Sequence, residues 1–446
     1  MPTQRLAPTD ALGGDMSPRS GLDITTAVVS STPLGTAELV ALPWDVPLED
    51  WPEHTLAALP RGLSRHVVRF AHLADSVVAV KETTETNARR EYQLLRRLER
   101  RDIRCVEPVA VVAGRTDPDG EPLPTVLVTR HLRFSLPYRA VFSRRLHRDT
   151  LTRLIDALAL LLVELHLVGF YWGDVSLSNT LFRRDAGAFA AYLVDAETGE
   201  LHPSLSRGQR EHDLDIARVN IAGELMDLMS GGLVDPDVDP VATSQLIIDT
   251  YRRLWEELTG DMSFRPGERW RVEERIRRLN ALGFDVEEYS IRTTEDGSEL
   301  VLQPKVVDPG HHHRRLLGLT GLDVQENQAR RLLRDIDEYR TVNHPDMDEH
   351  EAANRWVVDV FDPVARSIPP ELSGKLEPAE VMHQLLEHRW YLSENQSRSV
   401  PLTEALQSYL ETVLPQRRDE DAVILHPTTT MLRAVDPEST PRGPGQ

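Results

Sequence analysis

The chain has 446 residues, of which 27% are charged and 40% hydrophobic, as in an ordinary soluble globular protein. This length predicts roughly two or three domains, each able to bury its own core. The 51 Lys and Arg residues against 71 Asp and Glu give a net charge of −20. Such an acidic surface repels polyanions, so neither nucleic acid nor an anionic membrane is expected as a partner.

Cysteine usage and hydropathy bear on the compartment. Cys105 is the only cysteine, so no disulfide can form within the chain, which fits a reducing compartment. The first twenty residues lack the apolar run of a signal peptide. The most apolar stretch, 158–170, contains Glu164 and His166 and is too short to cross a bilayer. We therefore expect a cytoplasmic protein without a membrane span.

The N-terminal third predicts a small sheet with one helix. Residues 1–45 are rich in Pro, Gly, Ser, Thr and Asp without a period, which predicts a disordered segment. A turn is expected at 74–75 and another at 116–120. Apolar runs predict strands at 66–70, 76–81, 109–112 and 125–129.

A helix beginning near Asn87 carries an acidic residue on its apolar face. Glu91 lies three, four and seven positions before leucines, so it shares their helical stripe. A carboxylate on a packed face is costly without a partner, and Lys81 at the end of the preceding strand offers one. The alternative is that Glu91 lies at the stripe's edge and reaches water, with Lys81 an exposed strand end.

Basic residues are concentrated in this part of the chain. Residues 61–153 contain 19 Lys and Arg against 11 Asp and Glu, an excess of 19 − 11 = 8. Solvated helix faces explain such a run in most proteins. The alternative is that this half faces an anionic ligand.

The most informative pattern follows a long apolar helix that is expected from residue 151 to about Gly169. Asp174 and Asn179 lie five positions apart on a polar loop, and Asp195 follows an apolar strand at 192–194. A base-like carboxylate, a carboxamide and a lone carboxylate in this order are typical of phosphoryl-transfer sites. Such sites use them to orient a hydroxyl and to hold magnesium.

The rest of the chain predicts mainly helices. A run of Asp and Pro at 235–240 resembles a linker, and a hairpin across 289–307 is expected to turn at Asp296-Gly297. The run 311–313 of three histidines could bind a metal, but adjacent residues on one element point apart, which favours a loop or helix start. The tail 416–446 is expected to be flexible. Helices are predicted at 211–229, 241–259, 268–282, from Asp323 onward, 347–366, 377–393 and 402–414.

Taken in order, these elements resemble the protein-kinase-like superfamily. The resemblance is carried by Val78-Ala79-Val80-Lys81, Glu91, Asp174-x-x-x-x-Asn179 and Asp195. The segment WGDVSLSNTLF, residues 172–182, looks closest to the atypical branches: the lipopolysaccharide (Kdo) kinase, RIO-type and aminoglycoside phosphotransferase-like families. The C-terminal half resembles an uncharacterised domain attached to such regions.

This resemblance implies an α+β fold with two kinase-like lobes and a mainly helical C-terminal domain that contains a β-hairpin. The N-lobe is expected at 46–135, the C-lobe at 136–234 and the C-terminal domain at 235–415. The implied function is an ATP- and Mg²⁺-dependent phosphotransferase acting on a hydroxyl-bearing acceptor. The alternative is a pseudokinase or nucleotide-binding scaffold, whose C-terminal domain binds a protein partner or self-associates.

The resemblance also implies a role for each residue. Lys81 would pair with the nucleotide phosphates and Glu91 would hold the lysine. Asn179 and Asp195 would bind magnesium, and Asp174 would accept or orient the acceptor hydroxyl. Glu197 is either a second metal ligand or a residue with a solvent-exposed or salt-bridged role. The residues expected to contact the nucleotide base are Val128, Arg130 and Leu132.

Several features depart from the kinase pattern; the absent glycine-rich motif and Trp172, together with the large attached domain, favour the scaffold alternative. No G-x-G-x-x-G motif precedes the first strands, where Gly62 stands alone. Trp172 occupies the place of the usual catalytic-loop histidine, and Asp195 is followed by Ala-Glu instead of Phe-Gly. No obvious activation segment follows, so regulation by loop phosphorylation is not expected.

Overall fold

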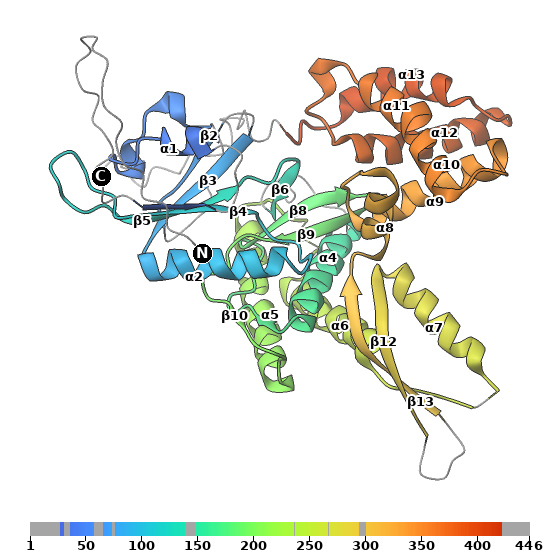
Figure 1. The fold of residues 1–446 in the computed structure, drawn as a ribbon, viewed down its shortest axis with the longest axis horizontal. Helices are drawn as coiled ribbons and strands as arrows, with labels where there is room; N and C mark the ends of the chain where they lie inside the picture. Colours follow the sequence, from blue (N-terminus) through green and yellow to red (C-terminus); the bar gives the residue numbers. More distant parts are fainter. Residues whose placement is uncertain are drawn as a thin grey trace, which may run out of the picture.

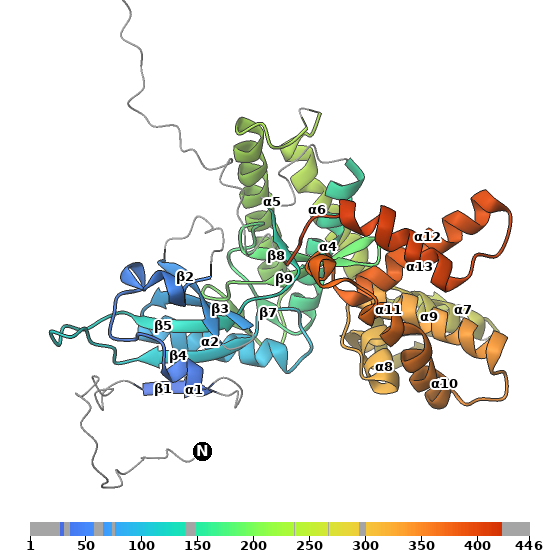
Figure 2. The same cartoon turned by 90° about the horizontal axis from the view of Figure 1, so that it is seen from above.

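The computed structural model describes residues 27–30, 36–57, 66–73, 76–138, 148–235, 237–265, 267–293 and 300–421. Within these ranges the chain forms an α+β fold, with two kinase-like lobes followed by a helical region, as predicted (Figures 1 and 2). The expected turns at 74–75 and 296–297, the isolated Gly62 and the tail beyond 421 lie outside the described residues.

The N-lobe is a five-stranded antiparallel sheet with a long helix on one face (Figure 1). Its strand order is β1 (Ala27–Ser30), β4 (Pro108–Ala113), β5 (Thr125–Arg130), β3 (Ser76–Thr83) and β2 (Val68–Leu73). Val111 and Leu127 face helix α2 (Glu85–Glu99), whereas their neighbours Val112 and Val128 face a second core. That core also contains Trp44 and Trp51 and residues of α1 (Thr36–Val40).

The expectation of disorder over residues 1–45 is wrong for part of this segment. Ala27–Ser30 form β1, an edge strand of the N-lobe sheet, which pairs with β4, and Thr36–Val40 form α1. Leu39 and Trp44 are buried in the N-lobe core. The composition of the segment does not reveal these elements, because the short strand and helix pair and pack with residues that lie later in the chain.

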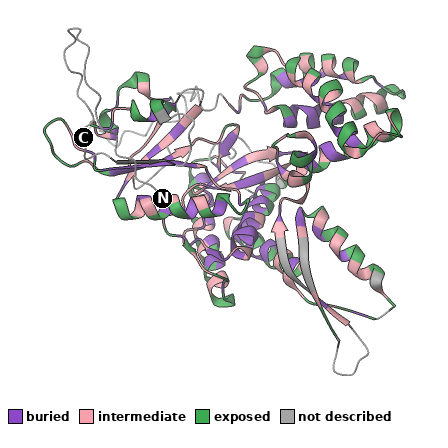
Figure 3. Cartoon of the chain, viewed as in Figure 1, coloured by how far each residue is buried: buried purple, intermediate pink, exposed green. Residues whose placement is uncertain are grey.

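The C-lobe is built around the apolar helix α4 (Arg148–Leu167), whose buried faces are visible in Figure 3. Beside it lies a three-stranded sheet in the order β6 (Ser135–Pro137), β8 (Thr180–Asp185) and β9 (Ala188–Leu193). A short pair, β7 (Phe170–Tyr171) with β10 (Glu200–Leu201), leads toward helix α5 (Arg207–Ser230).

The C-lobe core continues past the expected linker at 235–240. Helix α6 (Pro240–Thr259) packs against α4 and α5, and its Ile247 and Tyr251 belong to the same core. The side chain of Asp239 accepts hydrogen bonds from the first amides of α6, and Pro240 occupies its first turn. The acidic, proline-rich run is therefore a helix start rather than a linker.

A hairpin module and a helical region complete the fold. The module joins α7 (Arg269–Ala281) to a sheet in the order β11 (Met262–Phe264), β13 (Leu300–Pro309), β12 (Phe284–Thr293), a longer hairpin than the sequence indicates. The helical region, residues 311–421, has its own core. Its helices are α8 (His311–Thr320), α9 (Glu326–Asn343), α10 (Glu349–Trp356), α11 (Asp362–Arg366), α12 (Pro378–Gln396) and α13 (Leu402–Thr412).

Two predictions in the helical region have different outcomes. The run of histidines begins α8, which confirms the preference for a helix start. The predicted start of the next helix at Asp323 is wrong, because α9 begins after Gln325, whose side chain forms a capping box with Gln328. Glu326 instead accepts hydrogen bonds from the first amides of α8. Among the helices described, none has the length and apolarity needed to cross a membrane.

Candidate functional site

Lys81 and Glu91 meet between β3 and α2. Lys81 Nζ lies 2.9 Å from Glu91 Oε2, and only 2% of the Glu91 side chain is exposed. Glu91 shares its buried helical face with Ala88, Leu94 and other apolar residues, so it does not reach water at the stripe's edge. The cost of placing a carboxylate there is offset by the lysine on the neighbouring strand.

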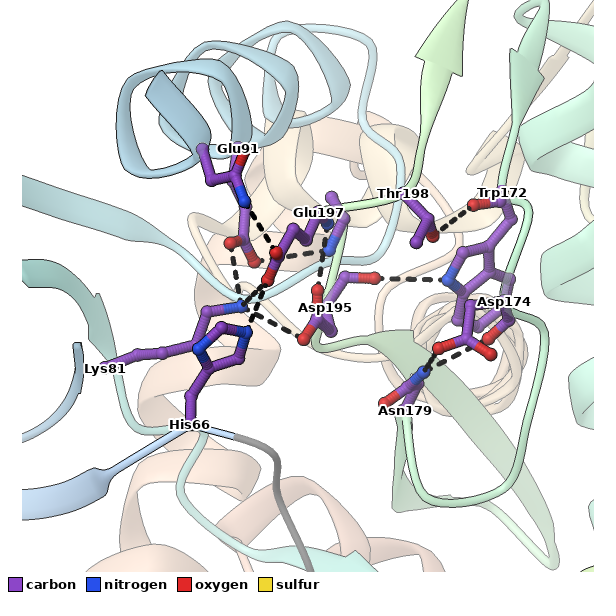
Figure 4. A network of polar contacts seen from close by, with 11 residues as sticks. His66, Lys81, Glu91, Trp172, Asp174, Asn179, Asp195, Glu197 and Thr198 are labelled. Atoms are coloured by element: carbon purple, nitrogen blue, oxygen red, sulfur yellow. Dashed lines mark hydrogen bonds and ion pairs between the residues drawn. The ribbon is translucent and has the colours of Figure 1, made fainter. Parts of the chain in front are cut away.

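Two further carboxylates contact the same lysine (Figure 4). Lys81 Nζ lies 3.0 Å from Asp195 Oδ2 and 3.2 Å from Glu197 Oε2. Glu197 also accepts a hydrogen bond from Asn87 Nδ2 at 2.8 Å and lies 3.0 Å from His66 Nε2. Glu197 is therefore part of the group and not a solvated surface residue.

The charges in this group do not balance. With all side chains ionised, Lys81 supplies +1 and the three carboxylates supply −3, which leaves 1 − 3 = −2. Burial lowers the pKa of Lys81, but Glu91 and Asp195 outweigh it, so the pKa is raised and the lysine stays charged. Burial raises the pKa of Glu91 to about 7, and the charge of Asp195 adds to this. The group favours additional positive charge.

The three carboxylates form a possible metal site. Glu91, Asp195 and Glu197 each offer an oxygen, and these oxygens lie within 4.8 Å of one another. Carboxylate oxygens are the ligands that magnesium prefers. The donor chemistry of this group therefore fits a hard divalent cation.

Asp174 and Asn179 lie together on the loop between β7 and β8, beside this group (Figure 4). Asn179 Nδ2 donates to Asp174 Oδ2 at 3.0 Å and to the Asp174 backbone oxygen at 3.1 Å. Asn220 Nδ2 on α5 donates to Asp174 Oδ1 at 3.3 Å. The backbone bond from Val194 N to Asn179 O, 3.1 Å, joins this loop to the segment that carries Asp195.

A buried aspartate outside the sequence motifs holds this loop. Asp213 on α5 accepts hydrogen bonds from Trp172 N at 2.7 Å and Gly173 N at 2.8 Å, directly before Asp174. Its Oδ2 also lies 3.1 Å from His166 Nε2, and His166 Nδ1 lies 2.7 Å from the Tyr251 hydroxyl. Burial lowers the pKa of His166, so this ring is neutral and can donate to Asp213 while accepting from Tyr251.

The other end of the loop is also held by α5. Glu224 accepts hydrogen bonds from Leu177 N at 2.8 Å and Ser178 N at 2.9 Å. Asn220 and Glu224 are one helical turn apart, so both face the loop. Trp172, a departure from the kinase pattern, is fully buried and donates from Nε1 to the Asp195 backbone oxygen at 3.1 Å. It therefore joins the two segments that carry the acidic residues.

The residues expected to contact the nucleotide base lie at the connector between the lobes. Val128 is fully buried in the N-lobe core. Arg130 pairs with Glu107 at 2.6 Å, and Leu132 is half-buried. The structure does not bring these three side chains into the group around Lys81, and their contact with a nucleotide stays a prediction.

Comparisons with known proteins find similarity to two families and to a solved structure. Residues 65–221 match the lipopolysaccharide kinase (Kdo/WaaP) family, and residues 253–414 match a domain of unknown function, DUF4032. The chain is also similar to a solved structure entitled "WaaP in complex with acyl carrier protein", at 19% identity and a TM-score of 0.35, over 57% of this chain and 99% of that one. No curated protein matches the chain. The two family matches confirm the resemblance: a region similar to the lipopolysaccharide kinase family is followed by a region similar to an uncharacterised domain.

Proposed function

We propose that this protein transfers a phosphoryl group from ATP to a hydroxyl-bearing acceptor in a Mg²⁺-dependent reaction. The observation that carries the proposal is the contact of Lys81 with Glu91, Asp195 and Glu197. One lysine among three carboxylates leaves a site that lacks positive charge. A nucleotide triphosphate bound with a divalent cation suits such a site, because the metal supplies charge that the protein does not.

Each side chain has a role that its contacts support. Asp195 and Asn179 are the proposed metal ligands, with Glu197 as a third candidate. Lys81 would exchange its contacts with Asp195 and Glu197 for the nucleotide phosphates, while buried Glu91 keeps the amine in place. Bound magnesium would neutralise phosphate charge. Asp174, oriented by two amide side chains, would accept the proton of the attacking hydroxyl.

Nucleotide binding with and without magnesium tests the proposal. We expect ATP to bind the wild type more tightly with Mg²⁺, and Asp195→Ala to lose this difference. Asp174→Ala should keep the binding and lose phosphoryl transfer, measured as ATP consumption over a panel of sugars, small metabolites and protein hydroxyls. Asp215→Ala is the control, since this carboxylate on α5 is 67% exposed and its ion pair among the described residues is with its helical neighbour Arg218.

Two results would contradict the proposal. If Mg²⁺ does not change ATP binding to the wild type, the acidic group is not a metal–nucleotide site. If ATP binds with Mg²⁺ but is neither transferred nor hydrolysed, the protein is a nucleotide-binding scaffold, as the missing glycine-rich motif suggests.

A further inference from the structure

We propose that the helical region positions the two metal ligands of the kinase-like lobes by holding the β8–β9 hairpin. The contacts between the helical region and the hairpin do not depend on the proposed function. Their consequence for metal binding rests on it. The residues that hold the hairpin are Asn327 and Gln328 at the start of α9 and Glu380 in α12. They are called the clamp below.

The hairpin connects the two proposed ligands directly. Strand β8 begins at Thr180, one residue after Asn179, and strand β9 ends at Leu193, two residues before Asp195. The strands pair from Thr180 opposite Leu193 to Asp185 opposite Ala188. Because a paired two-stranded ribbon moves as a unit, a shift at its turn is transmitted to both ligands at its open end.

The clamp holds the turn of this hairpin. Asp185 is 2% exposed, and its carboxylate accepts hydrogen bonds from Gln328 N and Asn327 Nδ2, both at 2.8 Å. The amide of Ala186 donates to Glu380 Oε2 at 3.1 Å. Ala186 has a φ of +48°, a conformation that an alanine rarely adopts. The surrounding contacts therefore fix a turn that the local sequence does not favour.

Gln328 is the centre of the clamp. This side chain is fully buried, and its Nε2 donates to the Arg184 backbone oxygen at 3.2 Å and to Glu377 Oε1 at 2.7 Å. Glu380 Oε2 lies 3.2 Å from the same nitrogen, so one of the two amide hydrogens is shared between two of these acceptors. One amide group therefore joins β8 to both α9 and α12. A buried network of this kind permits a single arrangement, because a shifted hairpin leaves polar groups unpaired.

The two faces of β8 show why the helical region is needed. Phe182 points into the C-lobe core and is fully buried. On the opposite face, Arg183 pairs with Glu377, and the Tyr192 hydroxyl of β9 donates to Gln325 at 2.7 Å. The hairpin lies between the C-lobe and the helical region, as Figure 1 shows. The C-lobe alone fixes only one of its faces.

Hydrogen–deuterium exchange of the full-length protein tests the inference without relying on activity. We expect Gln328→Ala to speed amide exchange roughly fivefold in 174–181 and 193–198. It should also weaken Mg²⁺-dependent ATP binding about tenfold, as loss of an outer-sphere partner does. Asn327→Ala removes one hydrogen bond to Asp185 and is the variant to measure if Gln328→Ala does not fold. Arg315→Ala, which breaks an exposed ion pair with Glu349 inside the helical region, is the matched control.

The inference is overturned if the clamp variants speed exchange only at the turn, 183–188, and leave 174–181 and 193–198 as in the wild type. It is also overturned if Arg315→Ala has the same effect as the clamp variants. Amide exchange of the clamp variants tests whether the clamp positions the loop. ATP titration of the wild type with and without Mg²⁺ tests the proposed function. The two failures are therefore distinguishable.

Discussion

Gly169 marks the point where the chain turns from α4 into the strand that leads to Asp174. It has a φ of +81°, and a Cβ there would lie 2.2 Å from the backbone oxygen of His202. Backbone cannot move aside as a flexible side chain can, so we expect Gly169→Ala to destabilise the protein by roughly 2–4 kcal/mol. Urea unfolding followed by tryptophan fluorescence measures this loss.

A second glycine provides the control for this substitution. Gly223 lies in the interior of α5 without a positive φ, and nothing within 4 Å would meet a Cβ there. Gly223→Ala should stabilise the protein by roughly 0.5–1 kcal/mol, because alanine loses less conformational entropy in a helix. Equal effects of the two substitutions would show that close approach at Gly169 is not the cause.

Asp185 makes stability depend on pH. Burial raises its pKa from 3.8 to about 6, and the hydrogen bonds from Gln328 and Asn327 offset only part of this. The folded protein therefore holds this proton more tightly than the unfolded chain. The stability that the group contributes falls as pH rises from about 4 to about 6, by up to roughly 3 kcal/mol.

Asp185→Asn removes this titration and keeps an oxygen that can accept a hydrogen bond from the clamp. Relative to the variant, the wild type should lose thermal stability between pH 4 and pH 7, measured as the difference in Tm across a pH series. Because both proteins share all other titrating groups, the contributions of those groups cancel in the difference in Tm. A difference that stays constant over this range would show that Asp185 is ionised throughout.

At the scale of elements, helix α6 supports the loop that carries Asp174, although α6 lies beyond the kinase-family match. Tyr251 reaches the loop through His166 and Asp213. Tyr251→Phe leaves a buried histidine nitrogen without its partner, which costs roughly 1–3 kcal/mol. We expect faster amide exchange at Trp172 and Gly173, because Asp213 is then less firmly oriented.

The control for Tyr251→Phe is the same substitution in the helical region. The buried Tyr409 hydroxyl donates to Gln384 at 3.2 Å, far along the chain from the loop. Tyr409→Phe should have a comparable cost in Tm and leave exchange at 172–173 unchanged. If both variants speed exchange at 172–173, the effect is global loosening and not loss of support from α6.

Elements with a local signal could be predicted from the sequence. The apolar period of α4 and the stripe of α2 are visible in short windows, and the pairing of Lys81 with Glu91 follows from them. Strand β8 could not be predicted in this way. Its residues Arg183 and Arg184 suggest an exposed turn, because their partners Glu377 and Glu420 lie about two hundred positions later.

In the candidate site, too, some residues have a signal in the sequence and others do not. Its motif residues are readable because their order along the chain is informative, whereas Asp213, Asn220 and Glu224 hold the loop from α5 without any motif. Asp213 did carry a usable signal, since it lies on the buried stripe of α5 with Ala217 and Ile221, just as Glu91 does on α2. A carboxylate on an apolar stripe predicts a buried partner, and for Asp213 the partners are two backbone amides and the ring of His166.

At the scale of the whole molecule, the end of the helical region returns to the kinase-like lobes. Glu420 pairs with Arg184 on β8, and Asp421 pairs with Arg133 in the connector between the lobes, both at 2.6 Å. The amide of Asp421 donates to the Gly374 oxygen at 2.9 Å, which ties this end to its own region. Two consecutive acidic residues therefore join the helical region to the hairpin and to the connector.

These two ion pairs should differ in strength because they differ in burial. Glu420 is 3% exposed in its pair, whereas Arg133 is 64% exposed in the other. Arg184→Ala leaves a buried carboxylate unpaired and should cost roughly 2–4 kcal/mol, whereas Arg133→Ala should cost less than about 1 kcal/mol. Arg184→Ala with Glu420→Gln should recover most of the loss, because no buried charge remains. Urea unfolding of the four proteins measures this, and equal losses for the two single variants would refute the dependence on burial.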